Sequence, residues 1–293
     1  MSNANTLVVF RHGLFADQTS MQPLEKYITG HILPGCMTDN HSYPWQDPVL
    51  DTGIDFAKYL VGKVAGDPKI HKVILVGHCQ GGLVCRVAVA TICDHAGLLG
   101  SFRLRNDPWL TNARQKLQAM DTVLLDEACR RMHSVVMLGT PNSGMYTYGQ
   151  LSMLATIAVR ETTRLVTVRG WNNFAELTTD RLFTLLQKVR VRDVKYVSLS
   201  GSSYSRYGAA LGVKLADLPL ISRLAPSLDV PNDGIIEDSS VDLSDAPLPP
   251  EIAELDKQYK HVRSYTECIR VAHRELAWDQ NVFDKLQLTD SWQ

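Results

Sequence analysis

A cysteine, an aspartate and a histidine occur in this sequence in an order and setting that suit nucleophilic catalysis. Cys79 follows an apolar, β-branched run, Asp233 lies in an Asn-Asp-Gly turn, and His273 follows the last apolar run of the chain. A thiol nucleophile needs a base that takes its proton and a group that orients that base. We therefore interpret Cys79 as the nucleophile, His273 as the base and Asp233 as the acid that holds the imidazole.

The segment around Cys79 predicts a sharp turn from a strand into a helix. Residues 73–76 are Val, Ile, Leu and Val, and residues 77–82 read Gly-His-Cys-Gln-Gly-Gly. This is the G-x-S-x-G pattern of a nucleophile elbow with cysteine in the place of serine. The glycines allow a strained turn, and the N-terminus of the following helix favours a thiolate. Taken alone, the pattern also suits a plain turn of the core, because buried cysteine is common.

Two further loops are expected beside this turn. Residues 11–14, Arg-His-Gly-Leu, follow the apolar run 6–10, and residues 139–144, Gly-Thr-Pro-Asn-Ser-Gly, follow the run 134–138. Strands that alternate with helices predict a mainly parallel sheet, in which ligands bind at the carboxyl ends of the strands. We therefore expect loops 11–14, 77–82 and 139–144 to meet at one edge. The backbone N–H groups of Leu14 and Gln80 would then stabilise an oxyanion.

The hydrophobic spacing assigns the remaining elements of an α/β core. We predict strands at 6–10, 27–33, 73–76, 134–138, 195–200 and within 262–271, and helices at 51–64, 83–90, 110–131 and 279–286. Residues 39–48 are expected to form an exposed loop, 97–108 a linker, and 272–276 a loop before the last helix. Asp279 is placed to cap that helix.

Residues 145–190 have a helical pattern without a clear strand. We interpret them as a helical cap or lid inserted over the site, which assigns the α/β core to residues 1–144 and 191–293. Ordinary helices behind the sheet are the alternative. Residues 229–256 hold nine acidic residues and neither Lys nor Arg, which predicts an exposed acidic excursion.

Composition limits the class of protein. The 293 residues suit one large or two smaller domains, and 45% hydrophobic with 21% charged residues is typical of a globular protein. A net charge of −1 gives no support for nucleic-acid binding.

No apolar run approaches the roughly 18 residues of a transmembrane segment, and the N-terminus does not read as a signal peptide. Six scattered cysteines without metal-ligand spacing favour a reduced cytoplasmic protein, with a mature secreted form as the alternative. We expect neither a metal site nor a cofactor.

Five motifs in order resemble those of the α/β-hydrolases, and more narrowly those of bacterial lipases and esterases. Residues 7–14 resemble the first strand and oxyanion loop of that branch, and residues 77–82 its Gly-His-Ser-Gln-Gly-Gly elbow. Residues 138–144 resemble its Leu-Gly-Thr-Pro-His-x-Gly loop, residues 232–234 the loop of the triad aspartate, and residues 273–276 the histidine loop. The resemblance implies an α/β-hydrolase fold and a carboxyl-ester hydrolase whose cap shapes an acyl pocket.

The sequence departs from this pattern in two places. Cysteine replaces the elbow serine, as it does in the polyhydroxyalkanoate synthases and the dienelactone hydrolases, the former of which transfer acyl chains through thioesters. His273 lies 40 residues after Asp233, because the acidic excursion intervenes. His261 is the rival base, 28 residues after Asp233. We favour His273, because His261 begins a predicted strand, whereas a base needs a loop just past a strand.

The predicted function is therefore hydrolysis of a small-molecule or lipid ester through an acyl-enzyme on Cys79. Two alternatives stay open: a thioester-based acyltransferase, and a catalytically weak hydrolase-fold protein that binds a ligand, such as a serine-to-cysteine variant of an esterase. The acyl length, the head group and the oligomeric state do not follow from the sequence.

Overall fold

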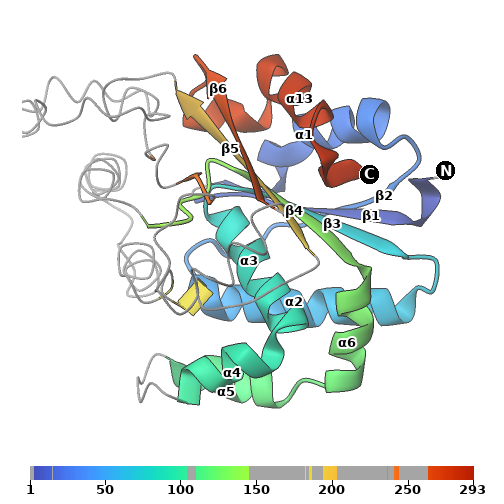
Figure 1. The fold of residues 1–293 in the computed structure, drawn as a ribbon, viewed down its shortest axis with the longest axis vertical. Coiled ribbons are helices and arrows are strands. Elements are labelled where there is room, and N and C mark those ends of the chain that lie inside the picture. The colour runs from blue at the N-terminus through green and yellow to red at the C-terminus, as the bar shows by residue number, and fades with distance from the viewer. Residues whose placement is uncertain are drawn as a thin grey trace, which may run out of the picture.

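The computed structural model describes residues 3–14, 16–103, 110–144, 194–202 and 263–293, together with residues 182, 185, 186, 236 and 241–243. These residues form one six-stranded sheet with helices on both faces (Figure 1). The strands are β1 (Thr6–Arg11), β2 (Met37–Asn40), β3 (Lys72–His78), β4 (Met132–Leu138), β5 (Lys195–Ser202) and β6 (Arg263–Ile269). Their order is β2-β1-β3-β4-β5-β6, and every described pairing is parallel.

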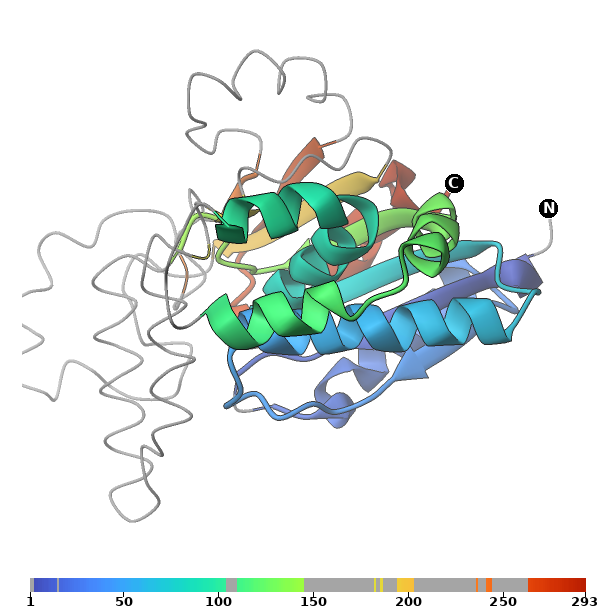
Figure 2. The ribbon, with the colours of Figure 1, turned by 90° about the horizontal axis from the view of Figure 1, so that it is seen from below.

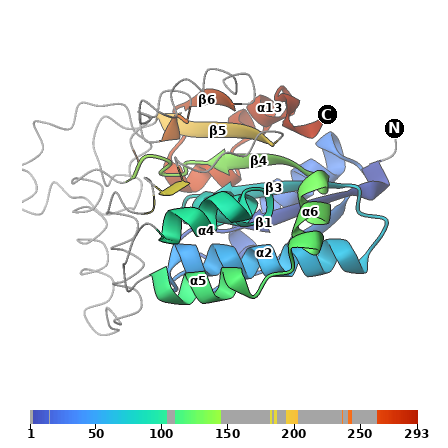
Figure 3. The same ribbon diagram turned by 60° about the horizontal axis from the view of Figure 1, so that its bottom comes forward.

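The helices form a layer on each face of the sheet. The principal ones are α1 (Gln22–Tyr27), α2 (Val49–Gly66), α3 (Gln80–Cys93), α4 (His95–Arg103), α5 (Thr111–Gln118), α6 (Thr122–Arg131) and α13 (Gln280–Gln287). Figure 1 shows α1 and α13 on one face and α2, α3 and α6 on the other. Helix α5 packs alongside α2 (Figures 2 and 3).

The two layers exist because neighbouring strand residues point to opposite faces. On β1, Leu7 and Val9 pack in the cluster that includes α2 and α3, whereas Val8 and Phe10 pack in the cluster that includes α1 and α13. All four side chains are buried. Continuous apolar strands of this kind are typical of a parallel sheet that is covered on both faces.

Most of the predicted elements are confirmed. The strands expected at 6–10, 73–76, 134–138, 195–200 and 262–271 correspond to β1, β3, β4, β5 and β6. The helices expected at 51–64, 83–90 and 279–286 correspond to α2, α3 and α13. The carboxylate of Asp279 accepts a hydrogen bond from the backbone N–H of Asn281 at 2.7 Å, so the predicted cap is present.

The strand predicted at residues 27–33 was wrong. The chain there continues from α1 into the short π-helix η3 (Ile28–Ile32), and β2 follows at Met37–Asn40. Met21, Leu24 and Ile28 are fully buried. Their spacing of three and four residues is that of a helix face, and this packing overrides the strand preference of Ile28, Thr29 and Ile32.

Three other boundaries also differ from the expectation. The linker predicted from residue 97 is helical in α4 as far as Arg103, and residues 104–109 lie outside the described residues. The helix predicted at 110–131 is two helices, because Asp121 caps a new one by accepting from the N–H of Val123 at 2.8 Å. Residues 273–277 form the short 3-10 helix η9 in place of an open loop.

The predicted cap lies almost entirely outside the described residues. Within residues 145–190 the structure describes Leu182, Leu185 and Leu186, which are buried in the same cluster as α2 and α3. The cap and the domain boundaries at 144 and 191 therefore stay predictions. Among the described helices, none is by itself long and apolar enough to span a membrane; α3 and His95–Phe102 meet those criteria together, as a pair bent by 104°.

Two leucines near the end of α13 are close in the sequence but differ completely in burial. Leu286 is fully buried in the cluster of the α1 and α13 face, whereas Leu288, two residues later, is 83% exposed. We expect Leu286→Ala to lower the free energy of unfolding by about 2–5 kcal/mol and Leu288→Ala to change it by less than about 0.5 kcal/mol. Urea unfolding followed by circular dichroism measures both. Equal losses would mean that α13 does not pack on the sheet as described.

Candidate active site

The backbone at Cys79 has the sharp turn that the sequence predicts. Strand β3 ends at His78, α3 begins at Gln80, and Cys79 between them has φ 54° and ψ −125°. This conformation is rare for a residue with a side chain and costs about 1–3 kcal/mol. Two bonds hold it, because the N–H of Cys79 donates to the carbonyl of Leu138 at 2.8 Å and the carbonyl of Cys79 accepts from the N–H of Gly82 at 3.1 Å.

Loop 11–14 packs directly against this turn. A Cβ added at Gly13 would lie 2.7 Å from Cβ of Cys79, and one added at Gly81 would lie 2.3 Å from the carbonyl oxygen of Arg11. Distances this short leave no room for a side chain on either residue. Glycine at both positions is therefore what allows the loop after β1 and the start of α3 to come into contact.

The loop after β4 reaches the same turn. A Cβ added at Gly82 would lie 1.9 Å from Oγ1 of Thr140. The predicted convergence of loops 11–14, 77–82 and 139–144 is confirmed. It follows from the parallel sheet, in which β1, β3 and β4 are neighbours and end at the same edge.

Asn142 fastens the loop after β4 to the surrounding elements. Its side-chain amide donates to the carbonyl of Val241 at 2.8 Å, and its side-chain and backbone carbonyls both accept from Nη1 of Arg86 at 3.2 Å. Both side chains are buried. Burial lowers the pKa of Arg86 to about 10, which leaves the guanidinium charged at neutral pH.

His273 lies beside the residue that precedes Cys79. Nε2 of His78 donates to the backbone carbonyl of His273 at 2.8 Å, and the two rings are 4.8 Å apart between centroids. Both histidines are buried. Burial, aided by the nearby His273, lowers the pKa of His78 to about 3, so His78 is neutral at physiological pH. His78 therefore packs against His273.

Comparisons with known proteins agree with this geometry. Residues 1–125 match the model of a family described as "Putative serine esterase (DUF676)". The mature form of the lipase BlEst2 from Bacillus licheniformis is 17% identical and has a TM-score of 0.57, with 97% of this chain and 92% of that chain covered. Lipase 1 from Pelosinus fermentans is 14% identical with a TM-score of 0.54, and the match covers 97% of this chain and 99% of that chain.

This chain has the α/β-hydrolase fold. The product of gene lin2722 from Listeria innocua shares the fold at 11% identity and a TM-score of 0.51, with 96% of this chain and 92% of that chain covered. Identities this low show a common fold and no more. No curated protein matches the chain. The fold class predicted from the sequence is therefore confirmed, and the hydrolase fold is that of lipases and esterases.

The structure places four of the five predicted site residues at or beside the elbow. Cys79, Gln80 and Leu14 belong to the elbow and the loop packed against it, and His273 lies next to His78. Asp233, and the rival base His261, lie outside the described residues. The roles of all five site residues, and that of His261, stay predictions.

The segment at residues 41–48 contributes to the site in a way that the sequence did not reveal. Tyr43 donates its hydroxyl hydrogen to the carbonyl of His12 at 2.7 Å, and Nε2 of Gln80 donates to the carbonyl of Trp45 at 3.2 Å. The exposed loop predicted at 39–48 was therefore wrong in part, because Asp39 and Asn40 belong to β2 and Asp39 is buried. A cluster of aromatic and histidine residues just past a strand at the site edge was the signal that could have indicated this role.

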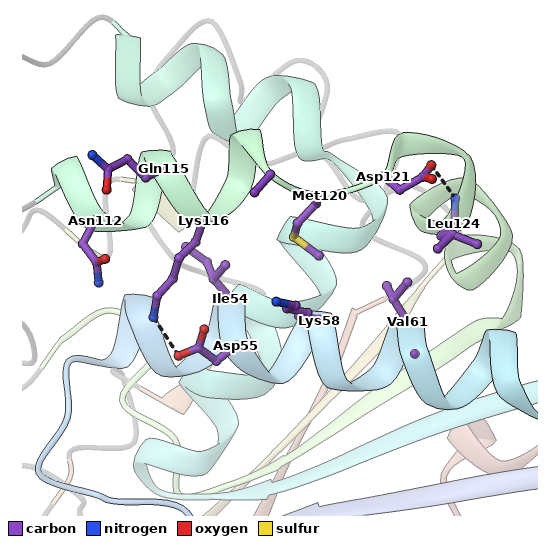
Figure 4. Close-up of a pocket in the computed structure, with 12 residues that line it drawn as sticks. Ile54, Asp55, Lys58, Val61, Asn112, Gln115, Lys116, Met120, Asp121 and Leu124 are labelled. Carbon is purple, nitrogen blue, oxygen red and sulfur yellow. Dashed lines mark hydrogen bonds and ion pairs between the residues drawn. The ribbon is translucent and has the colours of Figure 1, made fainter.

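A groove lies elsewhere on the molecule, between α2, α5 and the start of α6 (Figure 4). It has a volume of about 610 Å³ and is lined mainly by apolar surface, with the ion pair of Lys116 and Asp55 (2.7 Å) across one end. Its lining includes neither Cys79 nor His273. The groove is separate from the elbow and plays no part in the chemistry considered below.

The packing of loop 11–14 on α3 can be tested with two alanines. In Gly81→Ala the new Cβ meets backbone atoms, so we expect a loss of about 1–3 kcal/mol in the free energy of unfolding. In Gly62→Ala, on α2, the new Cβ has nothing within 4 Å, and we expect a gain of about 0.5–1 kcal/mol from helix propensity. Thermal and urea unfolding give both values. A neutral Gly81→Ala would show that the loop does not touch α3.

Proposed function

We propose that this α/β-hydrolase is a carboxyl-ester hydrolase that works through an acyl-enzyme on Cys79. One observation carries the proposal: Cys79 occupies the strained turn between β3 and α3, with loop 11–14 against its Cβ. That position is where a hydrolase of this fold presents its nucleophile. In the proposed triad, His273 takes the thiol proton and Asp233 orients the imidazole.

The proposed reaction has two halves. His273 accepts the proton of Cys79, and the sulfur attacks the ester carbonyl carbon to form a tetrahedral intermediate. The N–H groups of Leu14 and Gln80 stabilise its oxyanion. The carbon–oxygen bond then breaks, His273 protonates the leaving alcohol, and a thioester remains on the sulfur. Water, deprotonated by His273, attacks that thioester and releases the carboxylic acid and the thiol.

The chain that follows Asp233 supports a place for this residue near the site. Ile236, three residues later, is buried in the same cluster as Cys79. Val241 accepts the hydrogen bond from Asn142 in the loop after β4. Both contacts place Ile236 and Val241, which follow Asp233 closely in the sequence, in the layer in which the elbow lies.

The cysteine itself favours a second candidate, acyl transfer. An acyl-cysteine is a thioester, and thioesters pass their acyl group readily to alcohols and other nucleophiles. The first half-reaction would be the same, and the acceptor would replace water in the second half. Supplying an acyl-CoA with and without an alcohol acceptor separates the two, because a hydrolase releases the free acid in both cases.

Variants at position 79 test the proposed function. We expect wild type to hydrolyse p-nitrophenyl esters of increasing chain length. Cys79→Ala and His273→Ala should lose at least about 10³-fold in kcat/KM, because the nucleophile or its base is gone. If cysteine is the working nucleophile, we also expect Cys79→Ser to lose activity, because the shorter bonds of oxygen would move the tetrahedral carbon relative to the oxyanion donors.

Circular dichroism establishes that each variant is folded before its rate is compared. Undiminished hydrolysis by Cys79→Ala would reject Cys79 as the nucleophile. A large gain in Cys79→Ser would show that the site is shaped for oxygen, and cysteine would then not be its working nucleophile.

A further inference from the structure

The aromatic pair of His12 and Tyr43 holds loop 11–14 in place. The two rings stack with their centroids 4.4 Å apart and their planes 16° from parallel. The hydroxyl of Tyr43 donates to the backbone carbonyl of His12 at 2.7 Å. Tyr43 lies between β2 and α2, so the pair joins two loops that are far apart in the sequence.

Two more hydrogen bonds fix the proton on the imidazole of His12. The backbone N–H of Tyr43 donates to Nε2 at 3.2 Å, and Nδ1 lies 2.9 Å from the carbonyl oxygen of Gly13, which can only accept. Only the neutral tautomer with hydrogen on Nδ1 satisfies both. Burial lowers the pKa of His12, as does the charge of Arg11, while the bond to Gly13 and the carboxylate of Asp17 act in the opposite direction. The net effect favours this neutral ring.

The bond from Nδ1 sets the direction of the next backbone N–H. A trans peptide is planar, so the N–H of Leu14 points away from the carbonyl of Gly13; the described residues contain no cis peptide. Because that carbonyl faces the ring of His12, the N–H of Leu14 points to the other side of the loop. Cys79 lies against the same loop, with its Cβ 2.7 Å from where a Cβ of Gly13 would be.

We propose that His12 and Tyr43 are positioning residues that hold the N–H of Leu14 toward the oxyanion formed at Cys79. The proposal rests on the ester hydrolase function proposed above. Neither ring needs to touch the substrate. Tyr43 orients His12, His12 orients the peptide between Gly13 and Leu14, and that peptide carries the donor.

We expect the loss of this positioning to weaken stabilisation of the transition state and to leave substrate binding unchanged. Loss of one oxyanion donor costs about 10²–10³-fold in kcat. We expect His12→Phe, which keeps a stacked ring but has no donor for Gly13, to lower kcat about 100-fold with KM changed less than about twofold. Tyr43→Phe keeps the ring and the backbone N–H and should lose about 10-fold. His12→Asn places an amide donor near the carbonyl of Gly13 and should recover part of the loss.

Two measurements separate positioning from a general structural role. An alkyl trifluoromethyl ketone adds the sulfur of Cys79 to its carbonyl carbon; the carbonyl electron pair moves to oxygen and the thiol proton moves to His273. Its inhibition constant should rise in His12→Phe by the factor that kcat falls. Alkylation of Cys79 by iodoacetamide forms no oxyanion, so its rate should stay within about twofold of wild type.

Tyr27→Phe is the matched control. Tyr27 also stacks on a histidine, His31, at 4.7 Å, and donates its hydroxyl to Gln287 at 3.2 Å, away from the elbow. It should leave kcat and the inhibition constant unchanged. The proposal would be overturned if His12→Phe and Tyr43→Phe had the kcat and the inhibition constant of wild type. So would a rise in KM alone, or a parallel loss of alkylation of Cys79.

Failure of the proposed function gives a different result. If wild type neither hydrolyses esters nor forms the ketone adduct on Cys79, the nucleophile assignment is wrong and the positioning role is rejected with it. If wild type does both and the variants at His12 and Tyr43 match it, the positioning role alone is rejected.

Discussion

The left-handed backbone turn at Cys79 is the constraint on which the rest of the site depends. A residue at φ 54° is stable only when its surroundings hold it. Here β3 ends at the residue before it, α3 begins at the residue after it, and its N–H continues the ladder to β4. The turn therefore places the sulfur at the carboxyl edge of the sheet and at the N-terminus of a helix, where a developing negative charge is favoured.

Side-chain bonds to backbone carbonyls organise the three parts around this turn. His12 holds loop 11–14 through Gly13, and His78 holds the start of η9 through the carbonyl of His273. Asn142 holds the loop after β4, in which it lies, by donating to the carbonyl of Val241. Burial depresses the pKa values of His12 and His78, so their neutral forms make these bonds without bringing a charge beside Cys79. The scaffold orients peptide groups, which is what an oxyanion site requires.

The fold was predicted correctly from the sequence wherever one local signal was stronger than the competing ones. The apolar run before Gly77 and the glycines after Cys79 predict the strand, the turn and the helix together, and the carboxyl-edge rule then places loop 11–14 beside them. It was wrong at residues 27–33, where a short β-branched run fits either a strand or a helix and packing decided for the helix. It also could not reveal the pairing of His12 with Tyr43, because such contacts depend on the three-dimensional path of two loops. The role of Asp233 stays a prediction, since that residue lies outside the described part of the chain.

The cysteine is the feature that most needs a direct chemical test, because the matching family is described as one of serine esterases. The decisive measurement is mass spectrometry of the protein quenched in acid during turnover of a p-nitrophenyl ester, followed by peptide mapping. We expect one acyl group, as a thioester on the peptide that contains Cys79. In His273→Ala this acyl group should accumulate after slow acylation. Steady ester hydrolysis with no acyl group on Cys79, or with the acyl group on another residue, would contradict it.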